Sequence, residues 1–382
     1  MKSSKKPAKR LLLLLIILAL LVSGFFLLPK HVQRYFYWNY ADVHDFEKFP
    51  HLAVKNNEAD IFQFAHSGQN QHFSVPAKFS GDAPIPFETF LEDHSTLAFL
   101  VAVDDSIIYE NYFAGYNQDN IIPSFSVSKA FVSALTGIAI DEGYIYSTNQ
   151  SITFFLNELK PSFDDITIED LLNMRSGIRF NEGYNTPFAD MAKYYYGTDL
   201  LDYIKYLSIE DPPDKKYNYI SVNTLLLSQI IERATGTKLN VYLEKKIWRP
   251  LGMESDATWS IDSEESQTIK AFCCINAVAR DFLKFGRLYL NHGNWDGNQV
   301  VPENWVKRST SIINDSRDSQ NYPYTYQWRV LENGSFFAKG ILGQYIFVYP
   351  EKNLVFVRMG KSYGGIDWAQ LFLEISDQIG SD

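Results

Sequence analysis

Histidine is scarce in this sequence, and its placement excludes the commonest hydrolytic chemistry. Only seven histidines occur among the 382 residues. They stand at positions 31, 44, 51, 66, 72, 94 and 292. His292 alone lies after residue 95, and no G-x-S-x-G elbow offers it a nucleophile. No H-E-x-x-H or other metal-ligand spacing appears, and neither does a Walker loop or a G-x-G-x-x-G run. We therefore expect no Ser-His-Asp triad, no metal and no other cofactor.

Cysteine is almost absent as well. The only two, Cys273 and Cys274, are adjacent, and one pair of neighbours cannot staple distant loops. A disulfide scaffold is therefore excluded. We expect both residues to act as small apolar side chains in a buried strand.

Positive charge is in short supply beyond the first ten residues. The chain holds 35 Lys and Arg against 45 Asp and Glu, and five of the basic residues fall within residues 1–10. The remaining body is strongly acidic, which argues against a nucleic-acid partner. Residues 95–382 also lack repeats, low-complexity tracts and Pro/Gly/Ser linkers. We therefore expect one catalytic unit of two lobes.

A long apolar run follows the basic tail. Leu11–Leu28 spans 18 residues without a charge, and as a helix it would measure about 27 Å, close to the hydrocarbon thickness of a bilayer. The basic flank favours a single-pass anchor over residues 11–29, with residues 1–10 cytoplasmic and the catalytic domain periplasmic or extracellular. A cleaved signal peptide is the alternative, although the bulky FFLLPKH gives no small-x-small cleavage site.

The rest of the chain divides into a juxtamembrane and lead-in segment, residues 30–94, and a catalytic domain, residues 95–382. Within the domain, the patterns at 97–116 and 343–360 predict pairs of strands. Helices are expected at about 126–141, 167–177, 222–236, 276–293 and 368–379. This order predicts an α+β fold: an antiparallel sheet, built from both ends of the domain and flanked by helices, faces a helical lobe across a cleft.

A serine and a lysine three residues apart offer hydrolytic chemistry without histidine. In PSFSVSKAFVSALTGIAI (123–140), Ser126 and Lys129 open a helix that is otherwise almost wholly apolar. Residues three apart share a helix face, so the Lys129 amine can reach the Ser126 hydroxyl. A serine nucleophile needs a base beside it, and burial favours the neutral amine that can accept its proton. The Ser126 backbone N–H also faces a developing oxyanion. By itself S-x-x-K is a weak signal, because most such pairs are a helix cap and a solvated lysine.

Tyr219 offers a second proton carrier, just before the helix at 222–236 and two residues ahead of Ser221. A phenolate stabilised by a nearby lysine can pass a proton to a leaving group. The alternative is that Tyr217 and Tyr219 are core aromatics at strand spacing. Spacing alone favours this alternative, because the chain has 24 tyrosines.

Glycines near the start of a late strand form a third element. In AKGILGQYIFVYP (338–350), Gly340 and Gly343 let the backbone approach a ligand closely. The N–H of Ile341 can complete an oxyanion hole. We expect Ser221, Gly340, Gly343 and Gln344 to bind substrate. A bulge in an edge strand explains the glycines equally well.

The three elements occur in the order found in a known family. The chain resembles the serine hydrolases of the class C β-lactamase and penicillin-binding-protein type over roughly residues 95–380. It is most similar to the branch of 6-aminohexanoate-dimer hydrolases and related esterases. SVSK matches the family's S-x-x-K, YNYIS its Y-x-N or Y-x-S segment, and AKG stands where the family has K-T-G or H-x-G.

The resemblance implies a β-lactamase/transpeptidase-like fold and a division of roles. Ser126 would be the acylated nucleophile, Lys129 its partner and Tyr219 a proton shuttle. The backbone N–H groups of Ser126 and Ile341 would form the oxyanion hole.

Two positions depart from the family pattern. Ser221 replaces an asparagine that commonly orients substrate. Ala338 replaces the cation that β-lactamases and D,D-peptidases use for the substrate carboxylate, and Lys339 stands one residue out of register. These departures favour an ester or a small linear amide as substrate.

Three functional hypotheses follow. The first is a membrane-anchored, metal-free serine hydrolase that cleaves an ester, amide or peptide through an acyl-enzyme. The second is a penicillin-binding D,D-peptidase or β-lactamase acting on cell-wall peptides or β-lactams. The third, motivated by the altered third motif, is a non-catalytic binding module on the same fold. The oligomeric state is left open.

Overall fold

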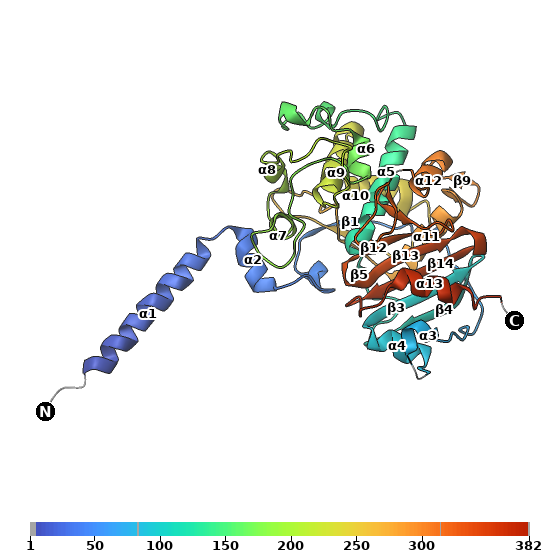
Figure 1. The fold of residues 1–382 in the computed structure, drawn as a ribbon, viewed down its shortest axis with the longest axis horizontal. Coiled ribbons are helices and arrows are strands. Elements are labelled where there is room, and N and C mark those ends of the chain that lie inside the picture. The colour runs from blue at the N-terminus through green and yellow to red at the C-terminus, as the bar shows by residue number, and fades with distance from the viewer. Residues whose placement is uncertain (1–4, 82–83, 314, 381–382) are drawn as a thin grey trace.

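The computed structural model describes residues 5–81, 84–313 and 315–380. A large sheet and a helical lobe form the body, and one long helix projects from it (Figure 1). The large sheet has the strand order β10-β11-β12-β13-β14-β3-β4-β2. All its pairings are antiparallel except β2 with β4. The strands are β2 (Ala65–His66), β3 (Thr96–Val103), β4 (Ser106–Tyr112), β10 (Tyr324–Thr325), β11 (Trp328–Val330), β12 (Phe336–Gly340), β13 (Gln344–Tyr349) and β14 (Leu354–Gly360).

This sheet confirms the predicted α+β fold with strands from both ends of the domain. The predicted strand pair at 97–116 is β3 and β4. Asp104 and Asp105 join them with φ of 47° and 64°, the left-handed conformation that a tight hairpin turn requires.

Both faces of the large sheet are buried, because successive residues of its central strands are apolar and their side chains point to opposite faces. In β14, Val355 and Val357 pack in the core beneath α11 (Ala279–Leu290). Phe356 faces the opposite core and stacks on Phe372 of α13 (Trp368–Ser376), with 5.0 Å between the ring centroids. The sheet is therefore a rigid wall between two layers of helix.

A smaller sheet, in the order β1-β6-β7-β5, lies between the large sheet and the helical lobe. Its strands are β1 (His51–Val54), β5 (Ile122–Pro123), β6 (Ala257–Ser260) and β7 (Ile275–Ala277), and β8 (Asn294–Trp295) with β9 (Asn298–Gln299) forms a separate hairpin. The lead-in segment supplies β1 to this sheet and β2 to the large one, so residues before 95 form part of both sheets.

The helical lobe lies above the sheet in Figure 1. Its helices are α5 (Ser128–Asp141), α6 (Ile168–Leu172), α7 (Asp190–Tyr196), α8 (Leu200–Ile204), α9 (Val222–Thr235), α10 (Leu239–Leu243) and α12 (Glu303–Ser309). The remaining helices and helical turns are α3 (Ala77–Ser80), α4 (Phe87–Asp93), η1 (Asp45–Glu47), η2 (Phe125–Val127), η3 (Ile152–Phe154), η4 (Pro161–Phe163), η5 (Glu244–Trp248), η6 (Ile341–Gly343) and η7 (Pro350–Lys352). Thr167 and Asp170 form a capping box at the start of α6. Gly236 ends α9 in the left-handed conformation.

The N-terminal helix α1 (Lys5–Phe26) projects away from the body (Figure 1). Its Lys9–Phe26 stretch is long and apolar enough to cross a membrane, and none of it is buried against the rest of the chain. A signal sequence near the N-terminus has the same features. The next helix, α2 (Lys30–Trp38), packs on α7, and Arg34 donates hydrogen bonds to the carbonyls of Tyr196 and Asp262. The segment that follows the apolar run is thus fixed to the lobe.

The expectation for the cysteines is wrong in two respects. Cys273 and Cys274 are buried, but they are joined to each other by a disulfide. They also precede β7 instead of lying within a strand. Cys274 has φ of 75°, a left-handed conformation that is incompatible with an extended strand.

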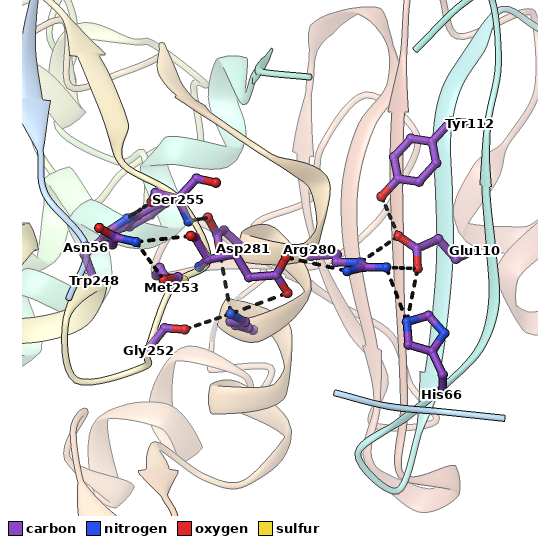
Figure 2. A network of polar contacts seen from close by, with 12 residues as sticks. Asn56, His66, Glu110, Tyr112, Trp248, Gly252, Met253, Ser255, Arg280 and Asp281 are labelled. Atoms are coloured by element: carbon purple, nitrogen blue, oxygen red, sulfur yellow. Dashed lines mark hydrogen bonds and ion pairs between the residues drawn. The ribbon is translucent and has the colours of Figure 1, made fainter. Parts of the chain in front are cut away.

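An ion network fixes the start of α11 between the two sheets (Figure 2). Arg280 binds both carboxylate oxygens of Glu110 in β4, each at 2.7 Å. Lys284 lies 3.6 Å from Asp281 and 3.7 Å from Glu254. Burial raises the pKa of Asp281 to about 7 and lowers the pKa of Lys284, because desolvation disfavours each charged form. The pair therefore stabilises the fold only while both partners are present.

Candidate active site

Ser126 lies in a short helical turn, η2, that leads into α5. Of the residues from Ile122 to Ala139, all of them described, it is the only one that is not fully buried. The preceding residue, Phe125, has φ of 44°. Such a conformation is costly for a bulky residue and persists only where the surroundings impose it. The turn thus presents one hydroxyl at the surface of an otherwise buried helix.

The Lys129 amine is buried and points at this hydroxyl. The residue is 1% exposed. Its Nζ lies 3.0 Å from Ser126 Oγ, 3.2 Å from Ser221 Oγ and 2.7 Å from the carbonyl oxygen of Phe272. The predicted face-sharing of Ser126 and Lys129 is therefore present. Three fixed partners hold the amine in one position, as a proton acceptor requires.

Ser221 connects Lys129 to a carboxylate that the sequence reasoning missed. Ser221 Oγ donates to Glu182 Oε1 at 2.5 Å, and its backbone N–H donates to Oε2 at 2.7 Å. The Tyr184 hydroxyl donates to the same Oε1 at 3.0 Å. Burial raises the pKa of Glu182, although Lys129 and these hydrogen bonds act in the opposite direction. The expected substrate-orienting role of Ser221 is not supported, because its side chain is buried and engaged between Lys129 and Glu182.

Tyr219 lies beside the same lysine. Its ring centroid is 5.2 Å from Lys129 Nζ and 5.7 Å from the Arg329 guanidinium carbon. The ring also packs edge-on against Tyr324. Tyr219 lines the cleft that contains Ser126, so it is an aromatic of the site wall as well as a proton-carrier candidate.

These residues surround a cleft of about 520 Å³. It is lined by Ser126, Glu182, Tyr184, Tyr217, Asn218, Tyr219, Arg317, Asp318, Ser319, Arg329, Lys339, Gly340, Ile341 and Tyr363. In the part of the chain that the structure describes, no histidine lines this cleft, and no cluster of three or more His, Cys, Asp or Glu side chains is arranged to hold a metal. A larger hollow of about 870 Å³ lies between α2 and residues 263–266. Because it contains none of the candidate catalytic residues, the smaller cleft is the candidate active site.

The third sequence element supplies the opposite wall. A Cβ added to Gly340 would lie 2.6 Å from the carbonyl oxygen of Ser124, so only glycine lets β12 pack this closely against the turn that carries Ser126. Ile341 lines the cleft directly after it. Two of the expected substrate-binding residues do not line the cleft. Gly343 packs on the buried Arg358 guanidinium, and the Gln344 amide is fully buried and bonded to the Gly360 backbone.

A cation is present in the cleft in spite of the altered motif. Alternation along β12 buries Ala338 in the core and directs the neighbouring Lys339 into the cleft. Burial, with Arg329 adding repulsion, lowers the pKa of Lys339 to about 8. Arg329 itself is bound to Asp318 at 2.5 Å, whereas Lys339 bonds the uncharged Gln320. The conclusion that this motif lacks a cation is therefore corrected: Lys339 stands one residue later and still reaches the cleft.

Comparisons with known proteins show the family of this chain. The family model described as Beta-lactamase matches residues 87–367. The 6-aminohexanoate-dimer hydrolase of Paenarthrobacter ureafaciens is 30% identical over 295 residues, covering 71% of this chain and 74% of that protein. The chain belongs to the beta-lactamase family.

Solved structures show the same fold. The structure named "Putative 6-aminohexanoate-dimer hydrolase from Bacillus anthracis" superposes with a TM-score of 0.78 at 24% identity, covering 90% of this chain and 94% of that one. A class C β-lactamase gives a TM-score of 0.60 at 15% identity, covering 77% and 94%. The fold is therefore β-lactamase-like, and the chain is a hydrolase-family relative of 6-aminohexanoate-dimer hydrolase.

Proposed function

We propose that this protein is a serine hydrolase that cleaves an ester or a small linear amide through an acyl-enzyme on Ser126. The observation that carries the proposal is the buried Lys129 amine, 3.0 Å from a partly exposed serine hydroxyl in a cleft without histidine. A binding module would have no need to bury a lysine against a hydroxyl. The relative in Paenarthrobacter ureafaciens, named 6-aminohexanoate-dimer hydrolase, supports the substrate class.

In the first half of the reaction, Ser126 Oγ attacks the substrate carbonyl and its proton passes to the Lys129 amine. The backbone N–H groups of Ser126 and Ile341 stabilise the oxyanion. Tyr219 gives its phenol proton to the leaving alcohol or amine as the carbonyl-to-leaving-group bond breaks, and the proton taken up by Lys129 passes to the Tyr219 phenolate. Water then attacks the acyl carbonyl, the ester bond to Oγ breaks, one proton of the water passes to Ser126 Oγ, and the acid product leaves.

Turnover of activated esters and linear amides by the full chain tests this proposal. Lys129→Ala should lower kcat by about 10²- to 10⁴-fold, the usual contribution of a nucleophile's proton partner, and Ser126→Ala, which removes the nucleophile, should lower it at least as much. Full activity in Ser126→Ala would overturn the proposal. An inactive wild type with a correctly folded cleft would favour the binding-module hypothesis.

Lys339 favours a second candidate, the penicillin-binding D,D-peptidase or β-lactamase. An ammonium that faces the cleft without an acidic partner among the described residues suits a substrate carboxylate. Labelled penicillin should acylate Ser126 in this case. Absence of acylation at high penicillin concentration, in a protein that turns over simple esters, would exclude it.

We further propose that α1 anchors the enzyme in a membrane, with the domain of residues 95–382 outside the cytoplasm. The unburied apolar stretch Lys9–Phe26 and the basic residues before it support this placement. The protein should resist extraction by alkaline carbonate and dissolve in detergent. Protease should be added to cells whose cytoplasmic membrane is intact but whose outer layers have been made permeable. It should cleave the domain and leave residues 1–10 uncleaved. Release by carbonate would contradict the anchor.

A further inference from the structure

The adjacent cysteines form a closed ring next to the catalytic machinery. Cys273 and Cys274 are the only cysteines of the chain, and they are 4% and 3% exposed. A disulfide joins these two neighbouring residues, and Cys274 has φ of 75°. A side-chain-bearing residue seldom adopts this conformation without a constraint.

Hydrogen bonds on both sides of the ring lead to the turn that carries Ser126. Immediately before the ring, the Phe272 carbonyl accepts from Lys129 Nζ at 2.7 Å. Immediately after it, Ile275 exchanges hydrogen bonds with Ser124: its N–H donates to Ser124 Oγ at 3.1 Å, and its carbonyl accepts from the Ser124 N–H at 2.7 Å. The ring therefore sets the distance between two attachment points of the nucleophile turn.

The ring's own carbonyls are also fixed. Trp259 Nε1 donates to the Cys273 carbonyl at 2.8 Å, and the Ser260 N–H donates to the Cys274 carbonyl at 3.1 Å. Both donors belong to β6 of the smaller sheet. Because β6 holds both ring carbonyls, a backbone change at 273–274 should move the Phe272 carbonyl more than it moves the ring carbonyls.

We propose that Cys273–Cys274 is a thiol–disulfide modification site that positions the Lys129 amine, with the oxidised form active. A small dithiol gives two electrons and two protons. The bond between the two sulfurs breaks, two thiols form, and the dithiol closes to its own disulfide. Without the ring, Cys274 is free to leave the left-handed region, and the Phe272 carbonyl no longer holds Lys129 against Ser126. The inference rests on the proposed hydrolase function, and the outward location proposed above suits a persistent disulfide.

The first test uses the full wild-type chain in detergent. Thiol titration under denaturing, non-reducing conditions should find no free thiol; two free thiols in protein isolated in air would overturn the proposal. After dithiothreitol treatment, the kcat for an activated ester should fall roughly 10- to 100-fold, because a misplacement of about 1 Å carries a cost of that order. KM should change little, and reoxidation should restore kcat. Two titratable thiols with an unchanged kcat would also overturn it.

Cys273→Ser/Cys274→Ser provides an independent route if the buried ring resists the reagent. This variant should have the kcat of the reduced enzyme, and dithiothreitol should not alter it. A wild-type kcat in the variant would overturn the proposal. A low kcat with an unchanged thermal unfolding temperature separates loss of positioning from unfolding, and should the variant fail to fold, reversible reduction of wild type decides. Activity that persists in Ser126→Ala refutes the hydrolase mechanism instead, whereas Ser126-dependent activity that ignores reduction refutes only the role of the ring.

Discussion

Replacing Glu182 with glutamine should impair catalysis without changing the shape of the cleft. The carboxylate accepts hydrogen bonds from the Ser221 N–H, the Ser221 hydroxyl and the Tyr184 hydroxyl. Glutamine keeps the shape and one oxygen, which can still serve the Ser221 N–H. Its NH₂ group then faces the two hydroxyls that donated to Oε1. Ser221 Oγ must turn its proton away, so it no longer holds Lys129 in the same way.

The size of the effect follows from the bonds that are lost. A hydrogen bond to a charged group contributes about 1.5–3 kcal/mol, and about 1.4 kcal/mol corresponds to a tenfold change in rate. We therefore expect kcat to fall roughly 10- to 100-fold in Glu182→Gln, with a smaller change in KM. Glu303→Gln is the matched control, because Glu303 is an exposed residue of α12 that pairs only with Lys307 among the described residues and lies outside the cleft.

The pH dependence gives this prediction a second readout. Burial raises the pKa of the Glu182 carboxyl, so wild-type activity should fall on the acid side at a pH above the usual range of glutamate. The ionised form is the acceptor, and activity is lost as the pH drops through that raised pKa. Glutamine does not titrate, and the acid limb should flatten. Steady-state rates from pH 4 to 8 measure both effects; a variant with wild-type kcat and an unchanged acid limb would refute the positioning role.

Further predictions test the cleft and the fold. Lys339→Met should raise KM for a carboxylate-bearing substrate below pH 8 but not above it, because the pKa of Lys339 is lowered to about 8 and the wild-type cation is itself lost at higher pH; equal KM at pH 6.5 would contradict this. Gly340→Ala should slow acylation at least tenfold, since the new Cβ would meet the Ser124 carbonyl, and unchanged labelling kinetics would count against the close packing. Lys284→Met should reduce the free energy of unfolding by about 3 kcal/mol because it leaves the buried Asp281 uncompensated. Adding Asp281→Asn should recover much of that loss in denaturant titrations, and simple additivity would show that the two groups are not coupled.

The parts of the site that depend on local spacing could be predicted from the sequence. Helix periodicity places Lys129 on the face of Ser126, and the strand patterns before and after the helical block meet in one sheet. These features are local, or follow from which apolar faces must be covered.

The missed features depend on tertiary contacts. Glu182 lies in a loop without periodicity, and only the fold brings it against Ser221. The cysteine ring lies beside Lys129 because β7 passes the nucleophile turn, which no spacing in the sequence reveals. Gln344 failed as a substrate contact because strand alternation turns its amide toward Gly360.

Peptide mapping of the acyl-enzyme tests the central claim most directly. The full chain is incubated with a fluorophosphonate or rapidly quenched during turnover of an activated ester, and the modified peptide is located by mass spectrometry. The account predicts a single adduct on Ser126 that forms about 10²- to 10⁴-fold more slowly in Lys129→Ala. An adduct on any other residue, or formation at the wild-type rate without the lysine amine, would contradict it.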